Sequence, residues 1–200
     1  MKKVLIGLVV IAVLALACGE EEGVTPTAPE RLEPTSPVNV LKNVEISFNR
    51  SDINLLKAML STNFVFYFDP RDVGSNPPGS HYVIPESWSY NEFWFAVNMV
   101  LVRAYSINLS IPTNRVGTPG ENETKYKADE ITIRLLVMVG ELNGFIAKEG
   151  YCNFEFERYE GKEGKKLWRL TDWWDNTATS YDANTGVAPT SLGRVLAIFN

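Results

Sequence analysis

The sequence predicts an α+β fold, in which two or three N-terminal helices pack on the concave face of a curved antiparallel sheet of about four to six strands. Three observations support this class. Apolar residues recur with helical spacing between residues 38 and 59. The apolar period then changes from about 3.6 to about 2 near residue 105. Asn143 and Gly144 form a strong hairpin signal between two stretches that have the period of a strand.

Three helices are expected in the first half of the folded region. The first begins near Val38 and carries its apolar residues on one face. Asp52 lies at a break and can cap a second, short helix. The third is expected over residues 90–103, because Ser89 and Glu92 form a capping-box pattern in front of an apolar segment.

Strands are expected on both sides of the third helix. The wholly apolar run at 64–68 predicts a short buried strand. Alternating apolar residues predict four long strands in an antiparallel meander, at 105–111, 125–139, 145–159 and 167–174. Gly150 marks a predicted bulge where the third of these bends. Thr190 or Ser191 is expected to cap a short C-terminal helix.

The N-terminus has the composition of a secretory signal peptide. Lys2 and Lys3 precede an apolar run that is short for a membrane span. The run ends at Ala17 and Cys18 and resembles a bacterial lipobox, with Ala15 where leucine is usual. The resemblance implies cleavage before Cys18 and diacylglycerol on its thiol, so that the lipid attaches the protein to a membrane. The alternative is an ordinary signal peptide that is cut near Ala17.

Three parts of the chain follow from this pattern. Residues 1–17 are the predicted signal peptide, and residues 18–37 are a lipidated cysteine with a disordered tether rich in Pro and Glu. Residues 38–200 form a single domain. Gly19 rather than Asp follows the cysteine, which resembles outer-membrane cargo in Gram-negative lipoproteins. The expected location is the cell envelope, on the periplasmic face of the outer membrane in a Gram-negative cell.

Charge and residue usage exclude several classes of function. The formal net charge is −5, and loss of the two lysines with the signal peptide makes it −7. A nucleic-acid partner is not expected, because the basic footprint for phosphate is missing from the sequence. His81 and Cys152 do not provide the ligand spacing of a zinc site. The sequence contains no phosphate loop or dinucleotide fingerprint, so neither a metal nor a cofactor is expected.

Segments 49–56, 64–69 and 167–175 resemble the nuclear-transport-factor-2-like (SnoaL-like) superfamily. The Trp-Arg-aliphatic-x-x-Trp pattern of that superfamily's closing strand falls on Trp168 to Trp173. The resemblance implies a cone-shaped roll with a cavity between the bent sheet and the helices. The superfamily includes isomerases, dehydratases and binding domains without activity, so the fold does not settle the function.

In such a cavity, a catalytic carboxylate or imidazole needs a pKa shifted by its surroundings. Asp69, His81 and Asp172 are weak candidates for this base, and Tyr67 and Tyr82 are candidate hydrogen-bond donors. Each candidate base has a simpler interpretation. Asp69 precedes a proline and ends a strand, His81 lies in a loop rich in Pro and Gly, and Asp172 faces solvent.

The candidates for ligand contact are aromatic or charged residues on predicted strands and helices: Tyr67, Trp94, Arg134, Trp168 and Asp172. The aromatic residues line a pocket in one interpretation and belong to the core in the other. Arg134 pairs with a carboxylate, binds an anionic ligand or points outward from its strand.

The preferred hypothesis is a lipid-anchored envelope protein whose domain binds a small apolar ligand or an envelope protein. One alternative is a purely structural component of an envelope complex. A second is an isomerase or dehydratase that uses an Asp or His base. A homodimer formed through aromatic residues on the outer sheet face is left open by the sequence.

Overall fold

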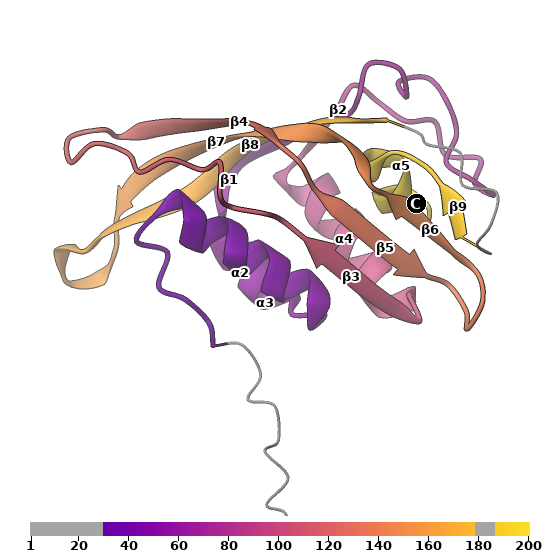
Figure 1. Ribbon diagram of the computed structural model, residues 1–200, viewed down its shortest axis with the longest axis horizontal. Helices are drawn as coiled ribbons and strands as arrows, with labels where there is room; N and C mark the ends of the chain where they lie inside the picture. The colour runs from indigo at the N-terminus through magenta and orange to yellow at the C-terminus, as the bar shows by residue number, and fades with distance from the viewer. Residues whose placement is uncertain (1–29, 179–186) are drawn as a thin grey trace, which may run out of the picture. The chain divides into compact units, whose positions relative to one another are not determined.

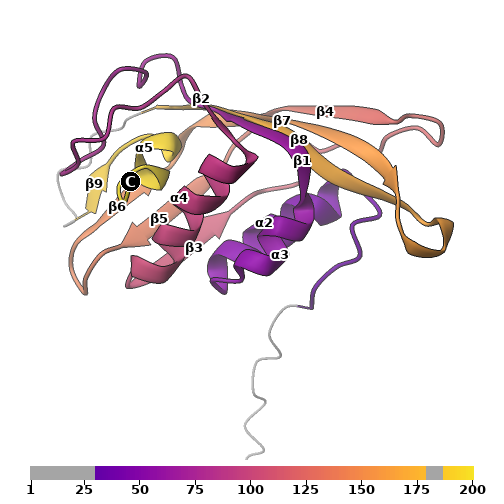
Figure 2. The same cartoon turned by 180° about the vertical axis from the view of Figure 1, so that it is seen from behind.

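The computed structural model describes residues 30–178 and 187–200. The predicted signal peptide, Cys18 and the tether as far as residue 29 lie outside the described residues. The folded unit is Arg31–Asn200. Within this unit, helices lie on one side of a curved sheet, as Figures 1 and 2 show from opposite directions. The predicted α+β class is therefore confirmed.

Helices α2 (Pro37–Asn49) and α3 (Ile53–Met59) form where they were predicted. The Ser36 hydroxyl caps α2 by accepting a hydrogen bond from the amide of Asn39, and Asp52 caps α3 in the same way. These side chains bind amides that the first helical turn leaves without partners. Sequence patterns fix both helices because caps and apolar stripes are local signals.

The fold begins before the predicted domain boundary at residue 38. The backbone of Leu32 exchanges two hydrogen bonds with the side chain of Asn43, at 2.9 and 2.7 Å. The Trp168 amide donates to the Pro34 carbonyl at 2.8 Å. Residues 31–36 therefore belong to the folded unit, because a helix and a distant strand bind their backbone groups. Composition alone did not reveal these partners.

Helix α4 (Tyr90–Arg103) has its predicted bounds and its predicted capping box. The Glu92 carboxylate accepts hydrogen bonds from the amide and the hydroxyl of Ser89, at 2.8 and 2.7 Å. These bonds stabilise the charged form and lower the pKa of Glu92.

Among the described residues, no helix has both the length and the apolar character needed to cross a membrane.

The described strands form two hydrogen-bonded sheets. The five-stranded sheet has the order β2 (Ser87–Ser89), β1 (Leu60–Tyr67), β8 (Lys166–Ala178), β7 (Glu149–Glu160) and β4 (Lys125–Ile131). The four-stranded sheet has the order β3 (Ser106–Ser110), β5 (Arg134–Met138), β6 (Gly144–Ala147) and β9 (Val187–Pro189). Strands β2 and β9 are too short to give a period in the sequence.

The sequence predicted a hairpin of two unbroken strands, at 125–139 and 145–159. In the structure each of them is divided into two strands, β4 and β5 in the first case and β6 and β7 in the second. Strands β4 and β7 belong to the five-stranded sheet, and β5 and β6 belong to the four-stranded sheet. Glu130 and Gly150 have φ values of 54° and 85°, and the register shifts in β4 near Glu130. The two predicted strands therefore bend at the same place. Gly150 lies in the bend, as predicted, and the shift in register falls on the partner strand β4.

Strand β1 pairs in parallel with β8, whereas the sequence led us to expect an antiparallel sheet. The remaining pairs in the five-stranded sheet are antiparallel. The prediction was wrong here because hairpin signals report only neighbours in sequence, and about a hundred residues separate β1 from β8.

The space between the helices and the five-stranded sheet is packed with aromatic rings. Phe66 on β1 is at the centre, with ring centroids of Phe93 and Trp173 at 5.3 and 5.8 Å. Trp88 and Phe68 complete its surroundings at 5.9 and 5.0 Å. All five side chains are buried. The protein's own aromatic residues therefore occupy the region in which the resemblance implied a cavity.

Replacing Phe66 with alanine should lower the free energy of unfolding by about 3–5 kcal/mol, because the rigid rings around it leave a cavity. Urea unfolding followed by tryptophan fluorescence measures this loss. Val65→Ala is the matched control, since the Val65 side chain lies on the opposite face of β1 and is only partly buried. An equal loss in both variants would contradict the central position of Phe66.

Candidate binding site at the end of strand β1

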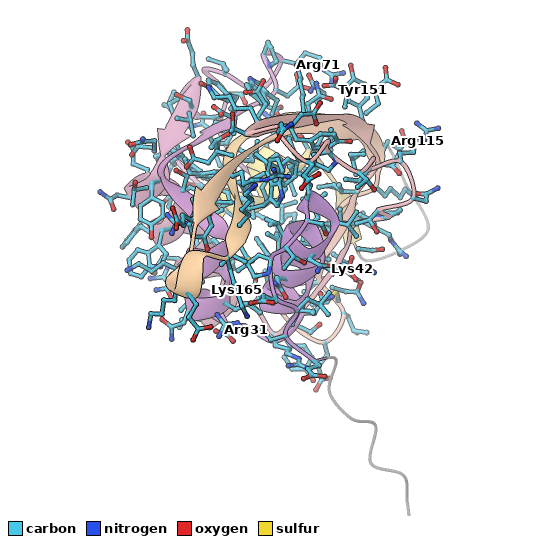
Figure 3. All side chains as sticks on the ribbon, turned by 90° about the vertical axis from the view of Figure 1, so that its left-hand side faces the viewer. Arg31, Lys42, Arg71, Arg115, Tyr151 and Lys165 are labelled. Atoms are coloured by element: carbon cyan, nitrogen blue, oxygen red, sulfur yellow. The ribbon has the colours of Figure 1, made fainter. Side chains whose placement is uncertain are left out.

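Asp69, a predicted catalytic candidate, is buried but already fully engaged. The residue is 2% exposed, and its carboxylate accepts hydrogen bonds from the backbone amide and Nε of Arg71, both at 2.8 Å, and from Nη2. Burial would raise the pKa of Asp69, but the bonds from Arg71 outweigh that effect and hold it below its usual value. Figure 3 shows Arg71 at the sheet side of the unit. A carboxylate locked in this way is a poor proton acceptor.

The other two catalytic candidates lie outside the packed interior. His81 is exposed in the loop between β1 and β2. Asp172 lies on the outer face of β8, next to a bulge at Thr171 that shifts the register with β7. Because the bulge adds one residue, Leu170 and Trp173 both point inward and Asp172 does not. The structure therefore does not bring Asp69, His81 and Asp172 together.

Asp172 instead meets Tyr67, another predicted site residue, on the outer sheet face. Burial, followed by the charge of Asp172 and its hydrogen bond, raises the pKa of Tyr67. The Tyr67 ring stacks on Trp174 with centroids 5.0 Å apart and an interplanar angle of 3°. Lys127 Nζ lies 5.6 Å from the Trp174 ring centroid. Tyr67 therefore stays a protonated hydrogen-bond donor beside an apolar ring.

A pocket of about 430 Å³ opens at this stacked pair, where the chain turns away from the end of β1. The walls come from β1, β8 and the loop that follows β1: Tyr67, Phe68, Pro70, Val73, Glu86, Trp174, Asp175 and Asn176. Two further hollows, about 660 and 390 Å³, flank the β7–β8 turn and are lined mainly by charged and polar residues. Only the first of these three combines two stacked aromatic rings with carboxylates.

Asp175, which the sequence analysis did not select, is the most perturbed acid of this pocket. It is 1% exposed and accepts hydrogen bonds from the amide and hydroxyl of Thr177 and from the Gly193 amide, at 2.9, 2.6 and 2.7 Å. Burial raises its pKa to about 6 despite these bonds. Because Trp173 points inward and side chains alternate along a strand, the sequence could have placed Asp175 and Thr177 inward as well.

Helix α5 (Leu192–Leu196) closes one side of this region and begins at Ser191, one of the two predicted caps. The Ser191 hydroxyl bonds to Asp72, and Arg194 Nε lies 3.2 Å from the same carboxylate. Gly193 allows the close approach, because a Cβ there would lie 2.5 Å from Phe68. Asp72 and Asp175 thus hold α5 and serve the architecture of the pocket.

The other predicted ligand contacts lie elsewhere. Trp168 is buried in the core under the guanidinium of Arg158. Trp94 is half-buried on α4, with Lys57 Nζ 5.4 Å from its ring centroid. Arg134 is exposed on β5, as its alternation with apolar neighbours predicts for an outward-pointing residue. Of the five predicted contacts, Tyr67 lines the pocket, and Asp172 lies beside Tyr67 without lining the pocket.

Within residues 30–178 and 187–200, no group of three or more His, Cys, Asp or Glu side chains is arranged to hold a metal ion. Asp69 and Asp72 have arginine partners, and Asp175 accepts its bonds from neutral donors. The pocket can therefore offer a ligand the aromatic wall of Tyr67 and Trp174, the carboxylate of Glu86 and the side chain of Asn176.

No protein-family model matches the sequence, and no curated protein matches it. Solved structures do show similarity. A conserved protein from Planctomyces limnophilus is 14% identical, with 70% of this chain and 92% of that chain covered and a TM-score of 0.49. An NTF2-like protein of unknown function from Pseudomonas putida is 10% identical over 76% and 89%, with a TM-score of 0.48.

An NTF2-like superfamily protein from Salmonella enterica is 10% identical, with 72% of this chain and 90% of that chain covered and a TM-score of 0.44. At these identities and TM-scores the likeness says nothing about activity. The fold assignment accordingly rests on the order of the chain's own elements and on their pairing.

Because the pKa of Asp175 is raised, the stability of the protein should depend on pH. The folded state binds the proton of the Asp175 carboxyl more tightly than the unfolded state, in which the pKa of this carboxyl is near 3.8. The contribution of Asp175 to stability should therefore be greatest below pH 3.8 and fall by on the order of 3 kcal/mol as the pH rises through about 6. Asp175→Asn should remove this fall.

Urea unfolding at several pH values between 4 and 7.5 measures the difference between the two proteins. Asp129→Asn is a control, because Asp129 is exposed on β4 and should leave the wild-type curve unchanged. Parallel curves for wild type and Asp175→Asn would contradict the prediction.

Proposed function

We propose that this chain is a lipid-anchored protein of the bacterial cell envelope with an NTF2-like domain that binds a small ligand or a protein partner. The observation that carries the proposal is the pocket at the end of β1, together with the closed interior. The Phe66 cluster fills the interior, whereas the stacked pair of Tyr67 and Trp174 stays accessible at the pocket. The anchor is proposed from the pattern that ends at Cys18.

The pocket favours a small, partly apolar ligand with a polar group. The ring edges of Tyr67 and Trp174 offer apolar area, and the side chains of Glu86 and Asn176 offer hydrogen bonds. The isomerase or dehydratase alternative lacks such support. It needs a base inside a cavity, and its three candidates are locked by Arg71, exposed in a loop or placed on the outer sheet face.

A structural role within an envelope complex is the second candidate. The filled interior favours it, since a domain that only joins other proteins needs no ligand cavity. The partner and the homodimer remain proposals.

Native mass spectrometry of residues 19–200, isolated from the envelope of its own cells, tests the ligand. A reproducible additional mass is expected on the wild-type domain, and Trp174→Ala should reduce its occupancy at least tenfold. Tyr151→Ala is the matched control, because Tyr151 is an exposed aromatic residue on β7 that does not line the pocket.

A clean unliganded mass for the wild type would count against a ligand and in favour of the structural role. An additional mass that persists undiminished in Trp174→Ala would show that the ligand binds outside this pocket, and loss in both variants would extend the site to Tyr151, which pairs with Asn176. The same spectrum reports whether the domain is a dimer.

A further inference from the structure

One edge of the domain carries most of its exposed apolar side chains. Eight large hydrophobic residues are notably exposed in the described part of the chain, and five of them form what we call the apolar edge: Phe95, Val102, Tyr105, Val139 and Leu142. Val102, Tyr105 and Leu142 are 73, 65 and 80% exposed. Scattered exposed apolar residues are normal, whereas a contiguous group marks an interaction surface.

Backbone geometry groups these five residues along α4 and along the strand ends that follow it. Phe95 and Val102 are seven residues apart and lie on the same face of α4. Tyr105 follows the end of α4, and its amide donates to the Met138 carbonyl at 2.7 Å, which places it beside Val139. The Val139 amide donates to the Asn143 carbonyl at 2.9 Å and closes the turn that carries Leu142.

The apolar edge arises from a row of inward-facing side chains on the four-stranded sheet, because this row continues beyond the packed core. Leu109 on β3 and Leu135 and Val137 on β5 occupy this row and are buried. Tyr105 and Val139 continue the same row beyond the strand ends, where no helix covers them. Nothing within the described fold shields the edge, so a surface outside the fold is its natural partner.

The apolar edge and the N-terminal segment lie on the same side of the domain. In Figures 1 and 2, residues 31–36 leave the fold on the side away from β4, β7 and β8, and the end of α4 and the β5–β6 turn lie on that side too. Twelve residues lie between Cys18 and Arg31, and the thirteen Cα–Cα steps between these two residues reach at most about 45 Å when extended. A lipid on Cys18 would thus hold a bilayer within reach of the edge at high effective concentration.

We propose that the apolar edge inserts into the interface of the lipid bilayer to which the chain is tethered. This inference rests on the proposed lipid anchor. Tyr105 has the apolar ring and polar tip that suit the membrane interface, and Leu142 projects from a turn. The acidic net charge rules out general attraction to anionic lipids, so the contact is apolar and works on uncharged lipid.

A site-specific fluorophore tests the insertion. The chain at residues 19–200 keeps every described core residue, since the core spans Val40 to Ala197. An N-terminal hexahistidine tag would bind it to phosphatidylcholine vesicles that contain nickel-chelating lipid, in place of the natural anchor. Leu142→Cys is labelled with a nitrobenzoxadiazole dye; Cys152 is fully buried, and burial raises the pKa of its thiol, so it escapes labelling.

Tethering should raise the emission at position 142 at least threefold and shift it to the blue. Val83→Cys is the matched control, because Val83 is 59% exposed in the β1–β2 loop, outside the apolar edge, and its dye should not respond. Val102→Glu in the Leu142→Cys background should abolish most of the response. Circular dichroism confirms that each variant is folded.

An unchanged emission at position 142, or an equal rise at position 83, would overturn the inference. So would a rise that depends on protein concentration without vesicles, since that would assign the edge to a second copy of the chain. The nickel lipid replaces the anchor, so the result does not depend on acylation of Cys18. The intact mass of the full protein extracted from membranes tests that acylation separately.

Discussion

The packing of Phe66 against Trp173 is the interaction on which the rest of the structure depends. These residues lie opposite each other on β1 and β8, the two strands that come together from distant parts of the chain. Their contact holds the parallel pair, to which β2 adds on one side and β7 on the other. It also fills the centre of the fold with aromatic rings, which contribute strongly to the core through their large buried area.

A filled centre determines where polar chemistry can occur. Asp69, Asp72 and Asp175 are all buried, but they lie at the end of the sheet, where loops and helix α5 supply hydrogen-bond donors. Two of these carboxylates are neutralised by arginine, and the third is held by amides and a hydroxyl. Burial of charge is tolerated only with such partners. This end of the fold therefore combines structural carboxylates with an accessible aromatic pair.

The site could be predicted only in part. Tyr67 and Asp172 were selected from the sequence and do lie together, but on the outer sheet face and not in a central cavity, and of the two only Tyr67 lines the pocket. The bulge at Thr171 decides this, because one inserted residue changes the face of every side chain after it. Asp175 was missed although Trp173 points inward two residues earlier. Trp168 was selected for its motif but lies in the core.

The sequence by itself determined the helices with their caps, the strand segments, the α+β class and the −5 net charge, because caps, periods and composition are local properties. The transfer of a hairpin between two sheets and the parallel pairing of β1 with β8 depended on the tertiary structure. So did the closure of the interior, the locking of Asp69 by Arg71 and the exposure of the apolar edge. These features arise from contacts between residues far apart in the chain, for which no local pattern carries a signal.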